Sequence, residues 1–187
     1  KVLKTTELTG LTIAEGANIA PTEGSSLTLT INGVETPIRP GTYRGNIVLT
    51  PTESITSEYR GKTYSLRTAI DIENGKYMPG KSVEAAAVGG EITGTYAKDV
   101  KITSIGENFN GIIAGGDTEY SYSIINPVIN LTGNGSSDFV GVGAAILSDG
   151  KADVTVANAS ITTCGVVRSA VVVTGDSTMH VNDSRIE

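Results

Sequence analysis

The C-terminal part of the chain repeats itself at a regular interval. Residues 154–161 (VTVANASI) align without a gap on residues 179–186 (MHVNDSRI), and residues 145–150 align on residues 170–175. The pattern occurs once more at residues 122–129 (YSIINPVI), at a longer interval from its counterpart, because a loop at residues 133–137 is inserted. Repeats of ~20–50 residues are typical of stacked units that bury an apolar face only against each other. The repeat therefore predicts successive coils of a β-solenoid.

Side-chain alternation within each repeat predicts which residues face inward. Alternate residues of a strand point to opposite faces, so Val154, Val156 and Ile161 are expected to point inward and to stack on the next coil. Their partners there are Met179, Val181 and Ile186, while Thr155 and His180 are expected to point outward. The remaining shared position is polar in all three copies: Asn126, Asn158 and Asp183. Short polar side chains of this kind satisfy backbone groups at a bend, which predicts a structural turn.

Composition favours short strands over helices. The chain of 187 residues has 23 Gly and no Trp, and aromatic residues make up 5%. Its apolar residues are mostly Val, Ile, Leu and Ala, and no window of ten or more residues has convincing helical periodicity. The single cysteine, Cys164, excludes an internal disulfide. Because extending the repeat alignment places it on Phe139, we expect Cys164 to be a small buried hydrophobic residue.

Charge and apolar runs limit the partners and the location. The 14 basic and 20 acidic residues give a net charge of -6 and include no basic run, so nucleic acid is not an expected partner. No run of about 18 apolar residues occurs, which predicts no insertion into a membrane. The sequence begins at Lys1 without Met, which is compatible with removal of a leader. We expect a secreted or cell-surface protein, with a cytoplasmic location as the alternative.

Two units are predicted along the chain. Residues 1–57 are expected to form a small antiparallel β-unit with a hairpin turn at Asn32 and Gly33, which covers the N-terminal end of the solenoid. Residues 58–187 are expected to form the parallel coils. The segment around Arg67 resembles the segment around Arg168, and their separation in the chain predicts that roughly four coils lie between them.

The last residue, Glu187, closes a strand at the point where earlier coils continue into a turn. A solenoid that stopped there would expose a layer of apolar side chains. We therefore expect the coils to continue beyond Glu187, or a second chain to cap them. A homo-oligomer is a further expectation.

The short strands, the recurrent Asn at a turn, the Val/Ile stacks and the Gly-rich corners resemble the pectate-lyase-like right-handed parallel β-helix, over residues 64–187. That resemblance is architectural, because no catalytic motif of those lyases or hydrolases matches residue by residue. The architecture is used by polysaccharide lyases and hydrolases, by epimerases and isomerases, and by surface adhesins. It implies an all-β fold and leaves the activity open.

Five residues are candidates for a site on the solenoid wall. His180 is the only histidine, and an outward histidine is suited to acid or base catalysis near neutral pH. Arg168 lies among valines and alanines, so it must point outward or be paired, and it is the second catalytic candidate. Arg67, Asn182 and Tyr122 are candidates for binding substrate. The alternative is that all five are ordinary surface or stack-capping side chains. No metal ligand set and no cofactor motif are predicted.

Three functions are compatible with these residues. The first is a β-helix enzyme, of lyase, hydrolase or isomerase type, acting on a carbohydrate or another polyhydroxylated or acidic substrate. The second is a non-catalytic adhesin-like protein, and the third is a carbohydrate-binding module. The expected partner is accordingly a small molecule or a glycan.

Overall fold

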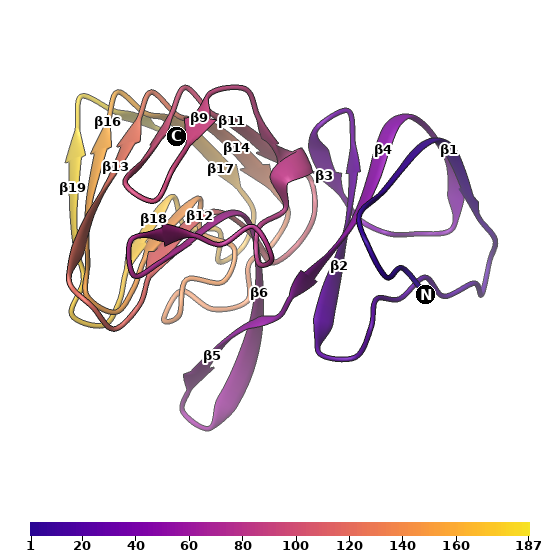
Figure 1. The fold of residues 1–187 in the computed structure, drawn as a ribbon, viewed down its shortest axis with the longest axis horizontal. Coiled ribbons are helices and arrows are strands. Elements are labelled where there is room, and N and C mark those ends of the chain that lie inside the picture. Colours follow the sequence, from indigo (N-terminus) through magenta and orange to yellow (C-terminus); the bar gives the residue numbers. More distant parts are fainter.

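The chain folds almost entirely into β-strands. A computed structural model describes all residues 1–187 and contains three mixed sheets and one short 3-10 helix, η1 (Glu84–Ala86). The N-terminal strands lie at one end of the long axis and β19 lies at the other (Figure 1). The structure has no helix long and apolar enough to cross a membrane.

The N-terminal strands form an antiparallel sheet in the order β1-β4-β2-β3. Their bounds are β1 (Thr6–Ile13), β2 (Ser25–Ile31), β3 (Val34–Thr36) and β4 (Gly41–Glu53). The predicted hairpin turn is confirmed, since Asn32 and Gly33 join β2 to β3 with φ angles of 51° and 80°. Such left-handed pairs match the twist of the strands they connect. Leu29, Ile47 and Leu49 form the small core of this sheet.

The rest of the chain is built from three ladders of parallel strands. The first ladder contains β10 (Tyr96–Lys98), β13 (Tyr120–Ile125), β16 (Ala152–Ala157) and β19 (Thr178–Asn182). The second contains β11 (Lys101–Ser104), β14 (Val128–Thr132), β17 (Ser160–Cys164) and β20 (Arg185–Ile186). The third contains β6 (Lys62–Glu73), β12 (Phe109–Gly115), β15 (Ile146–Ser148) and β18 (Val171–Val173). Strands of the three ladders alternate along the chain.

The strand register confirms the repeat found in the sequence. Val154 pairs with Met179 and Val156 with Val181, which is the alignment of the last two copies. Tyr122 pairs with Val154, the longer interval caused by the inserted loop. The resemblance between the Arg67 and Arg168 segments also has a structural basis, because Ile70 and Val171 occupy equivalent positions of the third ladder. The expected spacing of four coils between the two segments is wrong. Three steps join them, through Ile112 and Ile146, because the earlier turns of the chain are longer than the last one.

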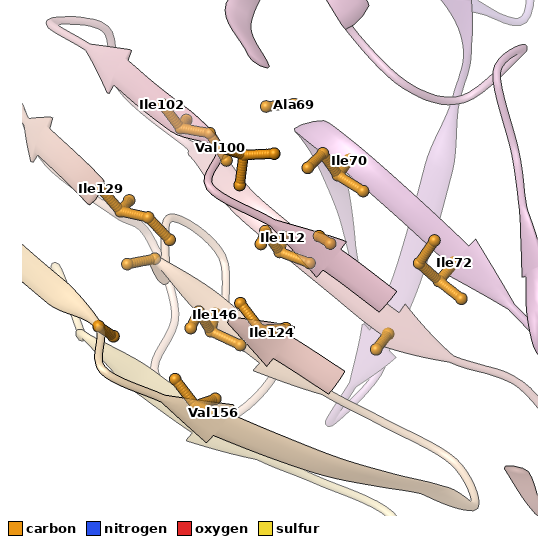
Figure 2. Packing of buried hydrophobic residues seen from close by; sticks show 14 of the residues in the cluster. Ala69, Ile70, Ile72, Val100, Ile102, Ile112, Ile124, Ile129, Ile146 and Val156 are labelled. Atoms are coloured by element: carbon orange, nitrogen blue, oxygen red, sulfur yellow. The ribbon is translucent and has the colours of Figure 1, made fainter. Parts of the chain in front are cut away.

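The main core lies between the ladders and is filled by their inward-facing residues. Figure 2 shows Ile70, Ile112 and Ile146 in succession, with Ile124 and Val156 stacked beside them. These side chains are buried, as alternation predicts. The final layer has the predicted stacking, since Val181 pairs with Val156 and Ile186 with Ile161, but Val181 is 40% and Ile186 is 46% exposed. Both lie on the last strand of a ladder, which has a neighbour on one side only.

The polar turn position is confirmed as structural. Asn126, Asn158 and Asp183 have φ angles of 51°, 53° and 47°, in the left-handed region that Asn and Asp tolerate best. Asp99 is a fourth member of this column, with φ of 57°, and its carboxylate accepts a 2.8 Å hydrogen bond from the Asn126 amide. Each turn of the chain therefore bends at the same place between the first and second ladders.

β10 and β11, the first strands of the first and second ladders, are each paired with a short strand that the sequence does not predict. β9 (Glu91–Ile92) pairs with β10, and β8 (Ala87–Val88) pairs with β11, both antiparallel. β3 also pairs with β11, so the N-terminal sheet continues into the second ladder. β5 (Ile55–Tyr59) and β6 form a projecting hairpin (Figure 1). β7 (Lys76–Tyr77) pairs with β6 in the antiparallel direction. A boundary at residue 57 stays a prediction.

Candidate functional site

Arg168, a predicted catalytic residue, is part of the packing. It is 7% exposed, and its two terminal guanidinium nitrogens donate hydrogen bonds of 2.9–3.1 Å to four backbone carbonyls. The acceptors are Gly106, Phe109, Thr132 and Gly143. Burial lowers the pKa of this guanidinium, although the Glu35 carboxylate opposes the shift. The expectation that Arg168 faces a substrate on the outer wall is wrong, because those two nitrogens bind backbone carbonyls inside the protein.

Arg67, a predicted substrate-binding residue, is also engaged within the protein. Its guanidinium forms an ion pair with Glu35, at 3.1 Å, and donates hydrogen bonds to the Thr28 hydroxyl and to the Glu107 carbonyl. Glu35 is buried and also accepts a 2.6 Å hydrogen bond from Ser104. These contacts join the N-terminal sheet to the ladders, which is a structural role.

Tyr122 is a core residue. It is 1% exposed, and its hydroxyl has no hydrogen-bond partner in the structure. Burial, with smaller contributions from Tyr120 and Tyr77, raises the pKa of the phenol well above its usual value. The hypothesis that Tyr122 lines an outer sugar-binding wall is therefore wrong.

Cys164 also differs from expectation. It is exposed, and its strand partner is Thr132. The gapless repeat alignment does not extend back to Phe139, because that residue lies in the connection between β14 and β15 and is 68% exposed. Both residues are on the surface.

His180 is on the outer face of the first ladder, as predicted. It pairs with Thr155, which in turn pairs with Ser123, so these three positions form one outward column across β19, β16 and β13. The His180 side chain is 61% exposed, and its Nε2 lies 3.7 Å from the Asp153 carboxylate. Asn182 is two residues further along the same strand and is exposed.

A shallow groove of about 710 Å³ surrounds the His180–Asp153 contact. It crosses the outer face of β13, β16 and β19 and the turns that precede them. Its lining residues are Glu119, Tyr120, Ser121, Lys151, Ala152, Asp153, Asp176, Thr178 and His180. Three carboxylates against one lysine and one histidine make the groove polar and net acidic. It contains neither Arg168 nor Asn182.

Part of the groove is visible in the sequence. His180 and Asp153 are recognisable as outward residues of the repeat, and they lie together because Asp153 pairs with Thr178, two residues before His180. Glu119, Lys151 and Asp176 give no such signal, because they lie in turns that precede strands. No group of three or more His, Cys, Asp or Glu side chains converges in a way that would hold a metal ion.

These features define an all-β protein with parallel ladders and a polar groove that contains its only histidine. Comparison of the chain with protein-family models, with curated proteins and with solved structures gives no match. The function therefore has to follow from the groove itself.

Proposed function

We propose that the three ladders form one right-handed parallel β-helix. Support comes from their interleaving, since consecutive strands belong to different ladders and the chain returns to each ladder as a parallel neighbour. Connections between parallel strands of one sheet are right-handed in about 98% of cases. An experimental structure in which the chain winds to the left would contradict the proposal.

On this framework, the groove around His180 binds a glycan without transforming it. The main support is that three carboxylates, one lysine and one histidine surround an open surface groove. These residues are Glu119, Asp153, Asp176, Lys151 and His180. Carboxylate, ammonium and imidazole groups are all suited to hydrogen-bonding sugar hydroxyls. Because the groove is net acidic, a neutral saccharide fits it better than a uronate, whose carboxylate would be repelled.

The exposure of the groove favours binding over catalysis. Electrostatic catalysis is strongest in a water-excluded site, whereas His180 and Asp153 are 61% and 55% exposed. The predicted second catalytic group, Arg168, is buried elsewhere. An adhesin-like or carbohydrate-binding role, secreted or at a cell surface, requires neither burial nor a second catalytic group.

Titration calorimetry with neutral oligosaccharides tests this role. Asp153→Asn and His180→Ala are expected to weaken binding at least about fivefold each, because each removes a polar partner of the ligand. Glu15→Gln is the matched control, since Glu15 is an exposed carboxylate outside the groove, and it should bind as the unmodified protein does. Absence of saccharide binding, or equal binding by all variants, would contradict the proposal.

Catalysis is the second candidate, and one contact favours it. A carboxylate beside a histidine orients the imidazole, as in acid–base sites, and Asp153 lies 3.7 Å from His180. An enzyme would release shortened or unsaturated saccharides, and His180→Ala would abolish that release. Stable, unmodified oligosaccharides after prolonged incubation with the protein would exclude this candidate for the substrates tested.

A further inference from the structure

Two aromatic rings that do not line the groove stack on each other. Tyr59, at the end of β5, and Phe139, in the loop between β14 and β15, have ring centroids 4.7 Å apart and planes inclined by 8°. Phe139 is 68% exposed and is one of only two phenylalanines in the chain. Stacked on Tyr59 and still largely exposed, the ring of Phe139 offers an apolar surface to a ligand.

The loop that carries Phe139 is held in place by a buried amide. Asn110 is fully buried, and its side-chain nitrogen donates to the Gly141 carbonyl at 2.7 Å while its oxygen accepts from the Gly143 N–H at 3.0 Å. Ser169 donates a 2.8 Å hydrogen bond to Asp138, next to Phe139. Phe139 is therefore presented in a fixed position, which lowers the entropic cost of binding a ligand.

Cations without acidic partners flank the aromatic pair. The Arg60 guanidinium lies 5.3 Å from the centre of the Tyr59 ring, and the Lys62 ammonium lies 4.7 Å from the centre of the Tyr64 ring. Neither cation belongs to an ion pair. The neighbouring carboxylates of Glu58 and Asp138 accept hydrogen bonds from the Thr63 and Ser169 hydroxyls and keep their charge. Because neither carboxylate is paired with Arg60 or Lys62, both cations can contact an anionic ligand.

The size of the surface limits what it binds. A stable protein interface needs roughly 800 Å² on each partner, while the exposed apolar part here is centred on one ring and is bordered by the charged tip of the hairpin. A single ring-shaped ligand with an apolar face and an anionic group matches both features. The apolar face of a pyranose ring is such a surface.

We propose that Tyr59 and Phe139 form a saccharide-binding platform for an anionic glycan, with a sugar ring stacked on Phe139 and a carboxylate or sulfate of the glycan bound by Arg60 at the Tyr59 side of the ring pair. This site rests on the proposed function only for the ligand class. Its unpaired cations distinguish it from the groove, which is lined by three carboxylates.

Binding of three tetrasaccharides, one carboxylated, one sulfated and one neutral, tests the platform by titration calorimetry. The anionic ligands are expected to bind, with the carboxylated and sulfated forms showing which anion is preferred. Phe139→Ala should weaken that binding at least tenfold and Arg60→Gln at least threefold, while Phe139→Tyr retains it. Higher salt should weaken it as well, because the charged partner is exposed.

Control variants separate this site from the groove. Leu3→Ala removes another exposed apolar side chain and should not affect anionic binding. Asp153→Asn should reduce only the binding of neutral ligands, so failure of one site is distinguishable from failure of the other. Anionic binding that survives Phe139→Ala in a folded variant would overturn the proposal. So would self-association that Phe139→Ala abolishes, since the ring would then serve contact between copies.

Discussion

The carboxylate of Glu35 and the guanidinium of Arg67 form an ion pair, at 3.1 Å, between the N-terminal sheet and the third ladder. The Glu35 side chain is 1% exposed and that of Arg67 is 23% exposed. Ser104, on the second ladder, donates a further hydrogen bond to the same carboxylate. One buried acid therefore connects β3 to two ladders, which makes it the polar centre of the junction.

Replacing Glu35 should lower the stability of the whole protein. Glu35→Ala leaves Arg67 without its anion and Ser104 without its acceptor, and removal of one partner of a buried pair costs roughly 3–5 kcal/mol. Urea denaturation measures the loss of unfolding free energy. Arg185→Ala is the control, because its ion pair with Glu187 is exposed and should contribute less than about 1 kcal/mol. Equal effects of the two substitutions would contradict this role of Glu35.

The sequence predicts the periodic parts of the structure. It does not predict the burial of side chains that other segments of the chain cover. Alternation places His180 outward and Val156 inward, because a strand repeats every two residues whatever surrounds it. Alternation does not say whether a loop or a sheet covers the outer face. Alternation therefore cannot tell that Arg168, expected to point outward or to be paired, takes the paired alternative, or that Arg67 pairs with Glu35. Their carbonyl and carboxylate partners are 25 to 62 positions away in the chain, and no local pattern indicates them.

Tyr122 and Cys164 are mispredicted for other reasons. Alternation places the Tyr122 side chain on the inner face of its strand. From there the sequence does not decide whether the ring fills the core or reaches the surface, and in the structure it fills the core. The alignment misplaces Cys164 because it extends into the connection between β14 and β15. The groove is predictable only through the pairing of equivalent repeat positions, so its turn residues Glu119, Lys151 and Asp176 are not predicted.

Asp71 is a buried acid on the face of β6 opposite the main core. It is 1% exposed, and one of its carboxylate oxygens has no hydrogen-bond partner. Burial, reinforced by Glu73 and opposed by Lys81, raises the pKa of Asp71 from 3.8 to about 7. The folded state therefore binds a proton that the unfolded state releases between roughly pH 4 and pH 7.

Stability should fall as the pH rises through that window. Below pH 4 both states are protonated at Asp71, and above pH 7 the folded state contains a buried charge that costs on the order of 4 kcal/mol. Asp71→Asn removes the charge, so its unfolding free energy at pH 8 should exceed that of the unmodified protein, while the difference shrinks or reverses at pH 4. Chemical denaturation across pH 4–8 measures the two curves. Parallel curves would show that Asp71 does not titrate in this range.

The register of the first ladder predicts where a disulfide will form. Ser123 and Thr155 are directly paired on β13 and β16, and neighbouring parallel strands are ~4.8 Å apart, within the span of a disulfide. Ser123→Cys with Thr155→Cys, in a Cys164→Ser background, should cross-link under mild oxidation. Ser121→Cys with Thr155→Cys is the control, because that pair is two residues out of register and should cross-link poorly. Mass spectrometry of the digested protein identifies the bond, and preferential cross-linking of the control pair would refute the register.

Val167 has the least favourable backbone conformation in the turn that leads into Arg168. Its φ angle is 53°, in the left-handed region, where a β-branched residue is an outlier. Strain of this kind costs of order 1–3 kcal/mol and persists only when the surroundings impose it. The next residue, Arg168, is held by four carbonyl groups, and we infer that these hydrogen bonds impose the strained turn.

Val167→Asn should therefore stabilise the protein, because Asn tolerates the left-handed conformation. A gain of about 1 kcal/mol would raise the melting temperature by about 2–4 °C in a chain of this size. Val166→Asn is the matched control, since Val166 is 70% exposed and has no positive φ angle, and its melting temperature should change little. If both variants melt at the same temperature, the backbone at Val167 stores no strain. The orientation of Arg168 must then come from its hydrogen bonds alone.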